Sequence, residues 1–476
     1  MNLDVYNTHM ELYPYVREDY PIIEKMYTAV DKFSGSEKPC GYMIEDGKLL
    51  LPRGTSISKI EYTCDINANI KTESDPYENM SRKFFSLYDP RDKLQEDSIK
   101  FLTKEKNHQL ALNLATGKGK SYVTAYAISQ LNIKAIIITP NETLKNQWIT
   151  KTFSGMFDYR SKNLINIASS NIIDAIMEDL IGPADIYFVN HQTLRSYMTS
   201  TNGYMLHQFF KKIKVGIKVY DESHMMFDNI LLLDFYTNTD RTWYLTATFD
   251  RSDKTESACF KRAFNSVDTF GEIESKAATR KHVIYHKVDI NSRITPKERA
   301  TVISYTGMTA ASYGKYAFFR DPNDTAYNAI LMILNKIKDV EGKTLIFIPL
   351  IDAIDEVVKK LKRDHSCKSI AAYHSRCTKD EKESAEKKDI IVSSIKSLGT
   401  GKDISGLRNV ICVEPIASKV VAEQMIGRLR PYAEDKDTYF WDIVDICIPA
   451  INWWHRARFK KIETLVKEIV NINLDK

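Results

Sequence analysis

The sequence has no long uncharged apolar run. None approaches the roughly 18 residues that a membrane-spanning helix needs. The N-terminal stretch MNLDVYNTHMELYPYV contains acidic side chains and lacks the apolar core of a signal peptide. We therefore predict a soluble, cytoplasmic protein with no membrane association.

Cysteine is also scarce, with seven residues in 476. An odd number without any C-x-x-C pair excludes the disulfide framework of a small secreted protein and favours reduced thiols. One cluster, formed by His365, Cys367, His374 and Cys377, raises the alternative of a zinc site. Its spacing matches no common zinc motif, and IAAYH (370–374) has the pattern of a strand and its exit, so we interpret these residues as loop and core.

The sequence also lacks a large excess of positive or negative charge. The 67 Lys and Arg residues against 62 Asp and Glu residues leave a net charge of +5, which permits a polyanionic partner without requiring one. With 43% hydrophobic and 27% charged residues and no low-complexity tract, the composition is that of a globular protein. At roughly 150 residues per domain, the chain is long enough for about three compact units.

Short apolar runs rich in β-branched or aromatic residues recur along the chain, separated by segments of helical character. In the first half they are AIIITP (135–140), DIYFVN (185–190), VGIKVY (215–220) and TWYLTAT (242–248). In the second half they are TLIFIP (344–349), SIAAYH (369–374), DIIVSS (389–394), NVICVEP (409–415) and TYFWDIV (438–444). This alternation predicts two α/β units in tandem, each a parallel sheet flanked by helices.

The domain boundaries follow from the same patterns. Residues 1–82 lack the alternation and contain a hairpin signal, GYMIEDGKLLLPRG (41–54), with Asp-Gly at its turn. We predict a small α+β N-terminal domain there. The first α/β unit covers 83–270, and the second covers 326–476 with a C-terminal helix. The polar, less regular interval 271–325 is interpreted as a connecting segment.

The stretch LATGKGKS (114–121) has the Gly-Lys-Ser ending of a phosphate-binding loop. An apolar run precedes it and helix-compatible residues follow, so the backbone N–H groups of Gly117 to Ser121 can converge at a helix N-terminus, where anions are favoured. We expect Lys120 to reach the β- and γ-phosphates of a nucleotide and the Ser121 hydroxyl to bind Mg²⁺. Leu114 stands where the general pattern begins with glycine.

An acidic pair suited to the same chemistry lies about a hundred residues downstream. In VYDESHMMF, Asp221 and Glu222 follow an apolar run that we expect to be a buried strand. Mg²⁺ prefers oxygen ligands and keeps several waters, so Asp221 is the expected metal ligand, partly through water. Glu222 is the expected general base for the attacking water.

These two segments, with others in the same order along the chain, resemble the motifs of superfamily 2 helicases. LATGKGKS is similar to the family's first motif, the tetrad DESH (221–224) resembles its second, and TAT (246–248) resembles its third. The resemblance implies that His224, Thr246 and Thr248 couple the nucleotide site to a nucleic-acid groove. It also implies two RecA-like domains.

Further motifs extend the resemblance to roughly residues 85–445. TPNETLKNQW (139–148), VNHQTL (189–194) and TLIFIP resemble motifs Ia, Ib and IV. They imply contacts with a nucleic-acid backbone from Thr139, Pro140, Gln192, Thr193 and Pro349. RDKLQEDSIKFL (91–102) is similar to the adenine-reading segment, with Gln95 as its carrier, and SLGTGKDISGL (397–407) resembles motif V. The implied nucleotide-binding residues are Gln95, Thr116, Gly117, Lys118, Gly119, Lys120, Ser121, Gly401 and Asp403.

EQMIGRLRPY (423–432) resembles motif VI and contains Gln424, Arg428 and Arg430. The resemblance implies that these three residues act in catalysis. The family's second arginine would fall at position 431, which is Pro431 in this chain, so Arg428 and Arg430 are both candidates for the arginine that reaches the γ-phosphate. Arg430 could instead pair with a carboxylate on the surface of the second unit.

The resemblance implies an enzyme that uses ATP and Mg²⁺ and works as a monomer. The compact core and the small N-terminal domain look most like the phage UvsW-type group, which implies an ATP-dependent DNA helicase that unwinds or remodels single-stranded, duplex or branched DNA in recombination, repair or fork processing. Two alternatives remain: an RNA helicase, and a nucleotide-gated nucleic-acid-binding subunit with weak hydrolysis. A nucleotide kinase or GTPase is disfavoured, because neither needs a second α/β unit with arginines.

The C-terminal segment WWHRARFKKIETLVKEIV (453–470) leaves two interpretations open. Its basic and aromatic residues, such as Trp453, Arg456 and Arg458, could contact a nucleic-acid strand. Alternatively, apolar residues at helical spacing pack an amphipathic helix on the second unit; these are Trp453, Phe459, Ile462 and Val466. We favour the second interpretation slightly.

Replacing Arg428 or Arg430 with alanine should separate their roles. The arginine that reaches the γ-phosphate should lose turnover far more than nucleotide affinity, because an arginine supplied by a second body contributes about 10³–10⁵ in rate. Measuring kcat and KM for ATP in both variants tests this assignment. Equal and small losses would show that neither arginine acts on the phosphate.

Overall fold

The computed structural model divides the chain into two compact units, Met1–Ile273 and Glu274–Lys476. It describes all residues except 17–20, 31–36, 40, 72, 105–107, 115–116, 160–162, 247–253, 266, 272–279, 305–306, 366–367, 400–403, 431–435 and 475–476. Each unit is described by itself below. Among the described residues, no helix combines the length and apolarity that crossing a lipid bilayer requires.

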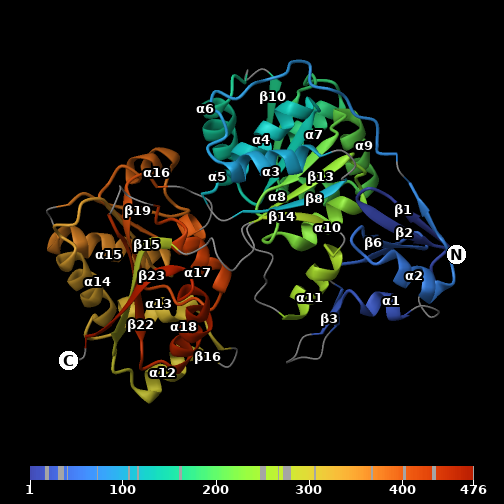
Figure 1. Cartoon of the computed structure of the whole chain (residues 1–476). Helices are drawn as coiled ribbons and strands as arrows, with labels where there is room; N and C mark the ends of the chain where they lie inside the picture. Colours follow the sequence, from blue (N-terminus) through green and yellow to red (C-terminus); the bar gives the residue numbers. More distant parts are fainter. Residues whose placement is uncertain are drawn as a thin grey trace. The chain divides into compact units, whose positions relative to one another are not determined.

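A parallel sheet forms the centre of the first unit (Figure 1). Its seven described strands run in the order β10-β11-β9-β12-β13-β8-β14, and all neighbours are parallel. The strands are β8 (Gln109–Asn113), β9 (Ala135–Thr139), β10 (Leu164–Ile167), β11 (Ile186–Asn190), β12 (Ile217–Tyr220), β13 (Arg241–Thr246) and β14 (Asp268–Gly271). Every residue of β9 and β12 is buried, which explains the continuous apolar runs in the sequence.

Helices cover both faces of this sheet. Ile137 belongs to one buried cluster with α4 and η1, whereas its neighbours Ile136 and Ile138 belong to a second cluster with α8 and α9. Side chains of a strand alternate between faces, so the two clusters are the two sides of one sheet. The helices are α3 (Lys93–Thr103), α4 (Lys120–Leu131), α5 (Glu142–Gln147), the π-helix η1 (Trp148–Phe153), α6 (Ser154–Met156), α7 (Ser170–Met177), α8 (His191–Ser200), α9 (Gly203–Ile213), α10 (Phe227–Phe235) and α11 (Lys254–Ala263).

The second unit repeats this architecture. Its seven described strands run in the order β19-β20-β18-β21-β22-β15-β23, all parallel. The strands are β15 (Arg280–Ile290), β18 (Lys343–Phe347), β19 (Ile370–Tyr373), β20 (Ile390–Ser393), β21 (Leu407–Cys412), β22 (Thr438–Asp445) and β23 (Val466–Asn473). The predicted pair of parallel α/β units is confirmed.

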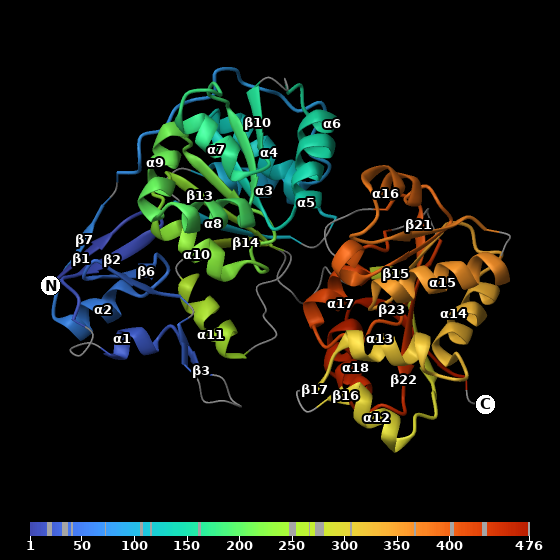
Figure 2. The same ribbon diagram turned by 180° about the vertical axis from the view of Figure 1, so that it is seen from behind.

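The helices of the second unit also lie on both faces of its sheet. Helices α14 and α15 pack with Ile346 in one cluster, and α17 packs with Leu345 and Phe347 in another. Figures 1 and 2 show α14 and α15 on one side of the sheet and α17 on the other. The helices are α12 (Pro296–Val302), α13 (Ala310–Phe319), α14 (Thr325–Lys336), α15 (Ile351–Asp364), α16 (Lys379–Ala385), the π-helix η3 (Ile395–Gly399), α17 (Lys419–Ile426) and α18 (Pro449–Ile462). A short hairpin joins β16 (Ile303–Ser304) to β17 (Gly307–Met308).

A smaller mixed sheet forms the N-terminal domain, with the order β5-β6-β2-β1-β7. Asp46 and Gly47 both have positive φ, 48° and 70°, as the tight turn of the predicted hairpin requires. The strands are β1 (Asn2–Val5), β2 (His9–Tyr13), β5 (Met43–Glu45), β6 (Lys48–Pro52) and β7 (Ala68–Ile70). Beside them lie α1 (Pro21–Lys25), α2 (Ile57–Cys64) and the pair β3 (Thr28–Val30) and β4 (Glu37–Pro39).

Two segments differ from the sequence interpretation. Strand β15 lies within 271–325, which we interpreted as a connecting segment, and pairs with β22 and β23. Polar residues such as His286, Lys287 and Asp289 interrupt its apolar pattern, which concealed the strand. In the C-terminal segment, the helix ends at Ile462 and the chain continues as β23 from Val466, so the single long helix is wrong.

The side chains of α18 also divide differently from our expectation. Trp453 is 66% exposed, whereas Arg458 is 2% exposed and donates from Nη2 to both carboxylate oxygens of Asp442 at 2.7 Å. The Tyr285 hydroxyl donates to the same carboxylate. Arg458 is therefore part of the core, and the burial that we predicted for Trp453 is wrong.

Arg458→Met should lower the free energy of unfolding of the second unit by about 3–5 kcal/mol, because it leaves the Asp442 carboxylate buried without its cation. Arg456→Met is the matched control: Arg456 lies on the same helix but is exposed, and a surface change of this kind should cost no more than about 0.5 kcal/mol. Urea denaturation of both variants measures the difference. Equal losses would show that the buried pair is not what stabilises this helix.

Candidate nucleotide site

The loop between β8 and α4 depends on glycine. Gly117 and Gly119 have φ values of 89° and 87°, in the left-handed region that glycine adopts at little cost. A Cβ atom on Gly119 would lie 2.5 Å from Nε2 of Gln95. The loop therefore turns tightly into the N-terminus of α4, where the helix dipole favours an anion. Ser121 lies in the first turn of this helix, and Thr116 lies outside the described residues.

Gln95 is packed against this loop. Its side chain is buried on α3, and Nε2 donates to the backbone oxygen of Lys118 at 3.1 Å. Its Oε1 accepts from the backbone N–H of Arg91 at 2.8 Å. The structure thus gives Gln95 a role in holding the loop. Its predicted contact with adenine stays a prediction.

The acidic pair lies beside the loop. Asp221 and Glu222 directly follow β12, and the backbone N–H of Asp221 donates to the oxygen of Ile138 at 2.9 Å. Lys120 Nζ lies 3.9 Å from Oε1 of Glu222 and donates to the backbone oxygen of Leu114 at 3.1 Å. The fold therefore brings together two groups of predicted site residues that lie about a hundred positions apart in the sequence. They meet at the carboxyl ends of parallel strands, where α/β proteins bind their ligands.

The backbone at Glu222 is strained. Its φ is 46°, a conformation that non-glycine residues rarely adopt outside functional sites. In this conformation the Glu222 N–H donates to Oδ1 of Asp221 at 3.0 Å. The turn places the carboxylates of Asp221 and Glu222 close together, although their surroundings differ: Asp221 contacts Trp148, and Glu222 lies near Lys120.

Trp148 is a residue that the sequence reasoning missed. It lies at the start of η1, is buried, and donates from Nε1 to Oδ2 of Asp221 at 2.8 Å. This bond fixes the orientation of the carboxylate. Trp148 ends the stretch that resembled motif Ia, but no spacing in the sequence links an indole at 148 to a carboxylate at 221.

The surroundings of Asp221 suit a cation. Burial, and after it the charge of Glu222, raises the pKa of this carboxyl to about 6, although the Trp148 hydrogen bond and the Lys120 charge act in the opposite direction. A buried carboxylate with a raised pKa gains from any added positive charge nearby. Mg²⁺ prefers oxygen ligands. The carboxylate oxygens of Asp221 and the hydroxyl group of Ser121 therefore fit the Mg²⁺ that we expected from the sequence.

His224 connects the turn that carries Asp221 and Glu222, the acidic turn, to strand β13. Its Nδ1 lies 3.0 Å from Oγ1 of Thr246 and 3.4 Å from Oε2 of Glu222. The backbone N–H of Ser223 donates to the oxygen of Leu245 at 2.9 Å. Two of the three predicted coupling residues thus meet beside the acidic pair. Thr248 lies outside the described residues.

The predicted nucleic-acid contacts of the first unit lie together at one edge of the sheet. Thr139 ends β9 and pairs in register with Asn190, which ends the neighbouring β11. The Thr139 hydroxyl donates to the Asn141 oxygen, and Thr193 bonds to Asn190 Oδ1 at 2.9 Å, so both side chains serve the fold. Pro140 follows β9, and Gln192 is exposed on the first turn of α8. Contact with nucleic acid stays a prediction.

The remaining predicted residues belong to the second unit. Gln424 lies on α17, Arg428 is 6% exposed just beyond this helix, and Arg430 is half-buried. Pro349 follows the end of β18. Gly401, Asp403 and Pro431 lie outside the described residues.

The zinc alternative finds no support in the described part of the chain, which contains no group of three or more His, Cys, Asp or Glu side chains suited to a metal. His374 Nε2 instead contacts Oδ1 of Asp355 at 2.9 Å, and Cys377 Sγ lies 3.4 Å from His374 Nδ1. Cys367 lies outside the described residues.

The N-terminal sheet packs against the helices that follow the acidic turn and strand β13. Phe227, Leu231 and Phe235 of α10 and Cys259 and Ala263 of α11 share one buried cluster with the N-terminal domain. Helix α10 begins three residues after His224. The N-terminal domain and the parallel-sheet part of the first unit are therefore joined by a common core.

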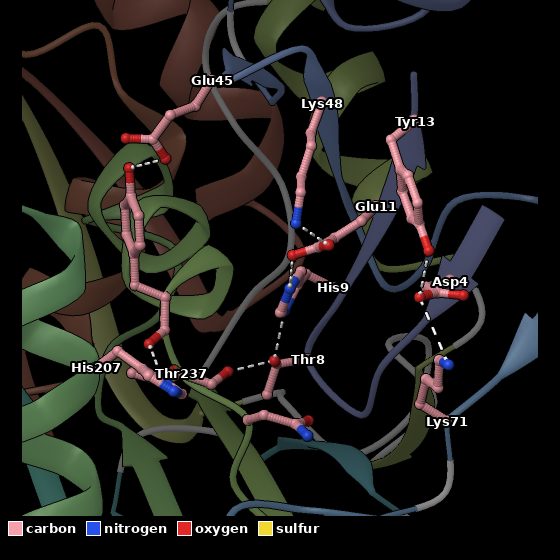
Figure 3. A network of polar contacts seen from close by, with 12 residues as sticks. Asp4, Thr8, His9, Glu11, Tyr13, Glu45, Lys48, Lys71, His207 and Thr237 are labelled. Carbon is pink, nitrogen blue, oxygen red and sulfur yellow. Dashed lines mark hydrogen bonds and ion pairs between the residues drawn. The ribbon is translucent and has the colours of Figure 1, made fainter. Parts of the chain in front are cut away.

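Polar contacts reinforce this junction (Figure 3). Lys48 Nζ bonds to Glu11 at 2.8 Å, Glu11 Oε1 lies 3.6 Å from His9 Nε2, and His9 Nδ1 lies 3.0 Å from the Thr8 hydroxyl. This hydroxyl donates to the backbone oxygen of Thr237, just beyond α10. A chain of contacts thus runs from the N-terminal sheet to the end of α10.

A buried charge pair continues from α10 to the acidic turn. Lys218 Nζ lies 2.7 Å from Oδ1 of Asp234 on α10, and the hydroxyls of Tyr220 and Tyr244 donate to the same carboxylate at 2.7 Å. Burial lowers the pKa of Lys218, and Asp234 opposes this effect. Since Tyr220 immediately precedes Asp221, the pair anchors the strand end that presents the acidic residues.

Two family models match the chain in succession. The model of the type III restriction enzyme res subunit matches residues 84–251, and that of the helicase conserved C-terminal domain matches residues 326–430. Transcript termination protein A18 of Yaba monkey tumor virus (strain VR587) is 23% identical over 445 residues, which are 87% of this chain and 86% of the relative.

Solved structures share the fold. Dbp5 of S. cerevisiae, bound to RNA and ADP BeF3, matches with a TM-score of 0.56 at 14% identity over 80% of this chain and 90% of that chain. T4 UvsW matches with a TM-score of 0.37 at 16% identity over all of both chains. At that score, the match carries no argument about the UvsW-type group.

Lys120→Ala should abolish ATP turnover and leave nucleic-acid binding largely intact, because it removes the cation beside the loop and not the remainder of the unit. A coupled ATPase assay and a fluorescence-anisotropy binding assay measure the two properties. Lys100→Ala, at an exposed position on α3, is the control. Wild-type turnover by Lys120→Ala would refute the loop as the nucleotide site.

One family model matches residues 84–251 within the first parallel-sheet unit, and the other matches residues 326–430 within the second. Both units have the fold of solved helicases. The chain belongs to the superfamily 2 helicases and is an ATP-dependent helicase.

Proposed function

We propose that this helicase moves along DNA, separates or remodels duplex or branched DNA, and acts in the release of transcripts. The similarity to a transcript termination protein, which extends over 86% of that protein, carries the proposal. The family model of a restriction enzyme subunit over residues 84–251 supports DNA as the track. This replaces the recombination, repair and fork processing that the sequence suggested.

We propose the following roles for the nucleotide-site residues of the first unit. The backbone N–H groups from Gly117 to Ser121 and the Lys120 ammonium would hold the phosphates of ATP at the N-terminus of α4. The Ser121 hydroxyl and Asp221 would hold Mg²⁺, which supplies charge neutralisation at the phosphate oxygens. Trp148 keeps the Asp221 carboxylate in the orientation that this role needs.

Glu222 is the proposed base for the attacking water. Its carboxylate lies between Lys120 Nζ, 3.9 Å away, and His224 Nδ1, 3.4 Å away, so its position depends on both neighbours. His224 also contacts Thr246, the first residue of the segment that resembles motif III. A change at Glu222 during hydrolysis would therefore reach β13 through one side chain.

The second unit would complete the reaction. We propose that Arg428 or Arg430 stabilises the charge that develops on the γ-phosphate and that Gln424 supports this step, as the family resemblance implies. Arg428 follows α17 within its own unit and is largely buried. A buried guanidinium loses little further side-chain freedom when it engages a phosphate.

The track contacts would be made mainly with the nucleic-acid backbone. Thr139, Pro140, Gln192 and Thr193 lie at one edge of the first sheet, and Pro349 follows a strand of the second. Backbone contacts position a protein without reading bases, so movement should be largely independent of sequence. We further propose that the protein works as a monomer in the cytoplasm.

The substrate is tested by ATPase activity measured side by side with single-stranded DNA, duplex, fork, four-way junction and RNA. DNA should stimulate turnover more than RNA, and Glu222→Gln should abolish stimulated turnover, which shows that the activity belongs to this site. Stronger stimulation by RNA would favour the RNA helicase. No stimulation by any nucleic acid would favour a nucleotide-gated binding subunit.

The process is tested on stalled transcription complexes fixed to beads through their DNA. Wild-type protein with ATP should release the labelled transcript, and Glu222→Gln should not. Retention of the transcript together with strong DNA-stimulated ATPase would contradict transcript release and leave the DNA helicase intact.

A further inference from the structure

A cavity of about 280 Å³ lies where the N-terminal domain meets α11 in the first unit. It is separate from the loop and the acidic pair, because none of those residues lines it. Three segments contribute: the residues after α1, the turn between β6 and α2 together with the first turn of α2, and the end of α11 with the residues just after it. The lining residues are Met26, Tyr27, Gly54, Ser56, Lys59, Lys261, Arg262 and Asn265.

The walls of this cavity are held together by direct contacts. A Cβ atom on Gly54 would lie 1.9 Å from the backbone oxygen of Ala263, so the turn after β6 and the end of α11 touch through their backbones. Arg262 donates from Nη1 to the backbone oxygen of Met26, which ties α11 to the residues after α1. The Tyr27 hydroxyl bonds to Thr55 Oγ1 at 2.8 Å. The cavity is therefore a defined feature of the junction.

The lining of the cavity is positively charged. The described lining residues include Lys59, Lys261 and Arg262, and none of them is acidic. Ser56 caps the N-terminus of α2, whose first turn also has no acidic side chain, so the positive end of the helix dipole adds to the three cations.

Two described acidic groups on the neighbouring elements are engaged elsewhere. Glu24 of α1 accepts hydrogen bonds from the hydroxyls of Tyr15 and Tyr42 at 2.8 and 2.9 Å. Glu61 of α2 accepts from the backbone N–H of Ala68 at 2.8 Å. Neither carboxylate is among the described residues that line the cavity, so neither neutralises Lys59 or Lys261 there.

We propose that this cavity binds a phosphate group of the nucleic-acid backbone and gives the N-terminal domain a nucleic-acid contact outside the helicase motifs. Ammonium, guanidinium and hydroxyl groups at a helix N-terminus are the donors that phosphate takes in proteins. The inference rests on the proposed function, because the cavity meets backbone phosphates only if the protein binds nucleic acid.

The position of the cavity gives the contact a consequence for catalysis. Helix α11 begins eight residues after Thr246, and α10 begins three residues after His224. Both helices share a buried cluster with the N-terminal domain. A phosphate held between Lys59 and Lys261 would therefore make α10 and α11, which support the residues proposed to act on ATP, more rigid. Nucleic-acid binding would then raise ATP turnover partly through this site.

The test uses the full-length protein with Lys59→Gln, Lys261→Gln and the double variant. Lys211→Gln is the matched control, because Lys211 is an exposed lysine on α9 that does not line the cavity. Duplex affinity is measured by fluorescence anisotropy between about 50 and 200 mM salt, since each neutralised phosphate of duplex DNA adds about 0.9 to the slope of log K against log salt.

Each cavity variant should weaken duplex binding several-fold at the lowest salt and lower the slope by about 0.9. The double variant should lower the slope no further, because both lysines hold the same phosphate. The duplex concentration for half-maximal ATPase should rise, with turnover in the absence of nucleic acid unchanged. Slopes and affinities equal to those of Lys211→Gln would overturn the proposal.

Lysine acetylation read by mass spectrometry distinguishes backbone phosphate from free phosphate. Duplex DNA should protect Lys59 and Lys261 at concentrations where inorganic phosphate does not. Equal protection by inorganic phosphate, with unchanged slopes in the variants, would make this a site for free phosphate and overturn the backbone contact. Failure of wild-type ATPase to respond to any nucleic acid would count against the proposed function, whereas a responsive wild type with unaffected variants counts only against the cavity.

Discussion

Parallel pairing of β8, β13 and β12 is the constraint on which the nucleotide site depends. Parallel strands end at the same edge of a sheet, so the loop after β8, Thr246 at the end of β13 and Asp221 after β12 are neighbours. About 100 residues separate the loop from Asp221, and about 125 separate it from Thr246. Two connections follow from it: Lys120 to Glu222, and His224 to Thr246. Lys120 could not meet Glu222 if β8 or β12 were reversed, and His224 could not meet Thr246 if β12 or β13 were reversed.

The site combines features that cost stability with a rigid support. Glu222 has a left-handed backbone, and Asp221 is a buried carboxyl whose pKa is raised to about 6. Such features persist only where the surroundings hold them in place. Trp148 fixes one carboxylate oxygen, and the buried pair of Lys218 and Asp234 anchors the strand that leads into the turn. The scaffold thus keeps charges close together that would separate in water.

The N-terminal domain is part of this support. Its core continues into α10 and α11, and its polar contacts reach Thr237 at the end of α10. Helix α10 begins shortly after the turn that carries Asp221 and Glu222, so the N-terminal domain packs against a helix that is connected to this turn. The basic cavity beside Gly54 lies at this junction, which is why a ligand there could affect both nucleic-acid binding and ATP turnover.

The sequence by itself determined the fold class, most of the strands and the hairpin at Asp46 and Gly47, because periodicity and turn chemistry are local properties. It also revealed the motifs, because the loop and the acidic pair each consist of residues that are adjacent in the sequence. Only the tertiary structure showed that Trp148 holds Asp221, that Arg458 is buried against Asp442 and that β15 belongs to the second sheet. These facts depend on partners distant along the chain, and a local pattern carries no information about which distant residue packing will place beside it.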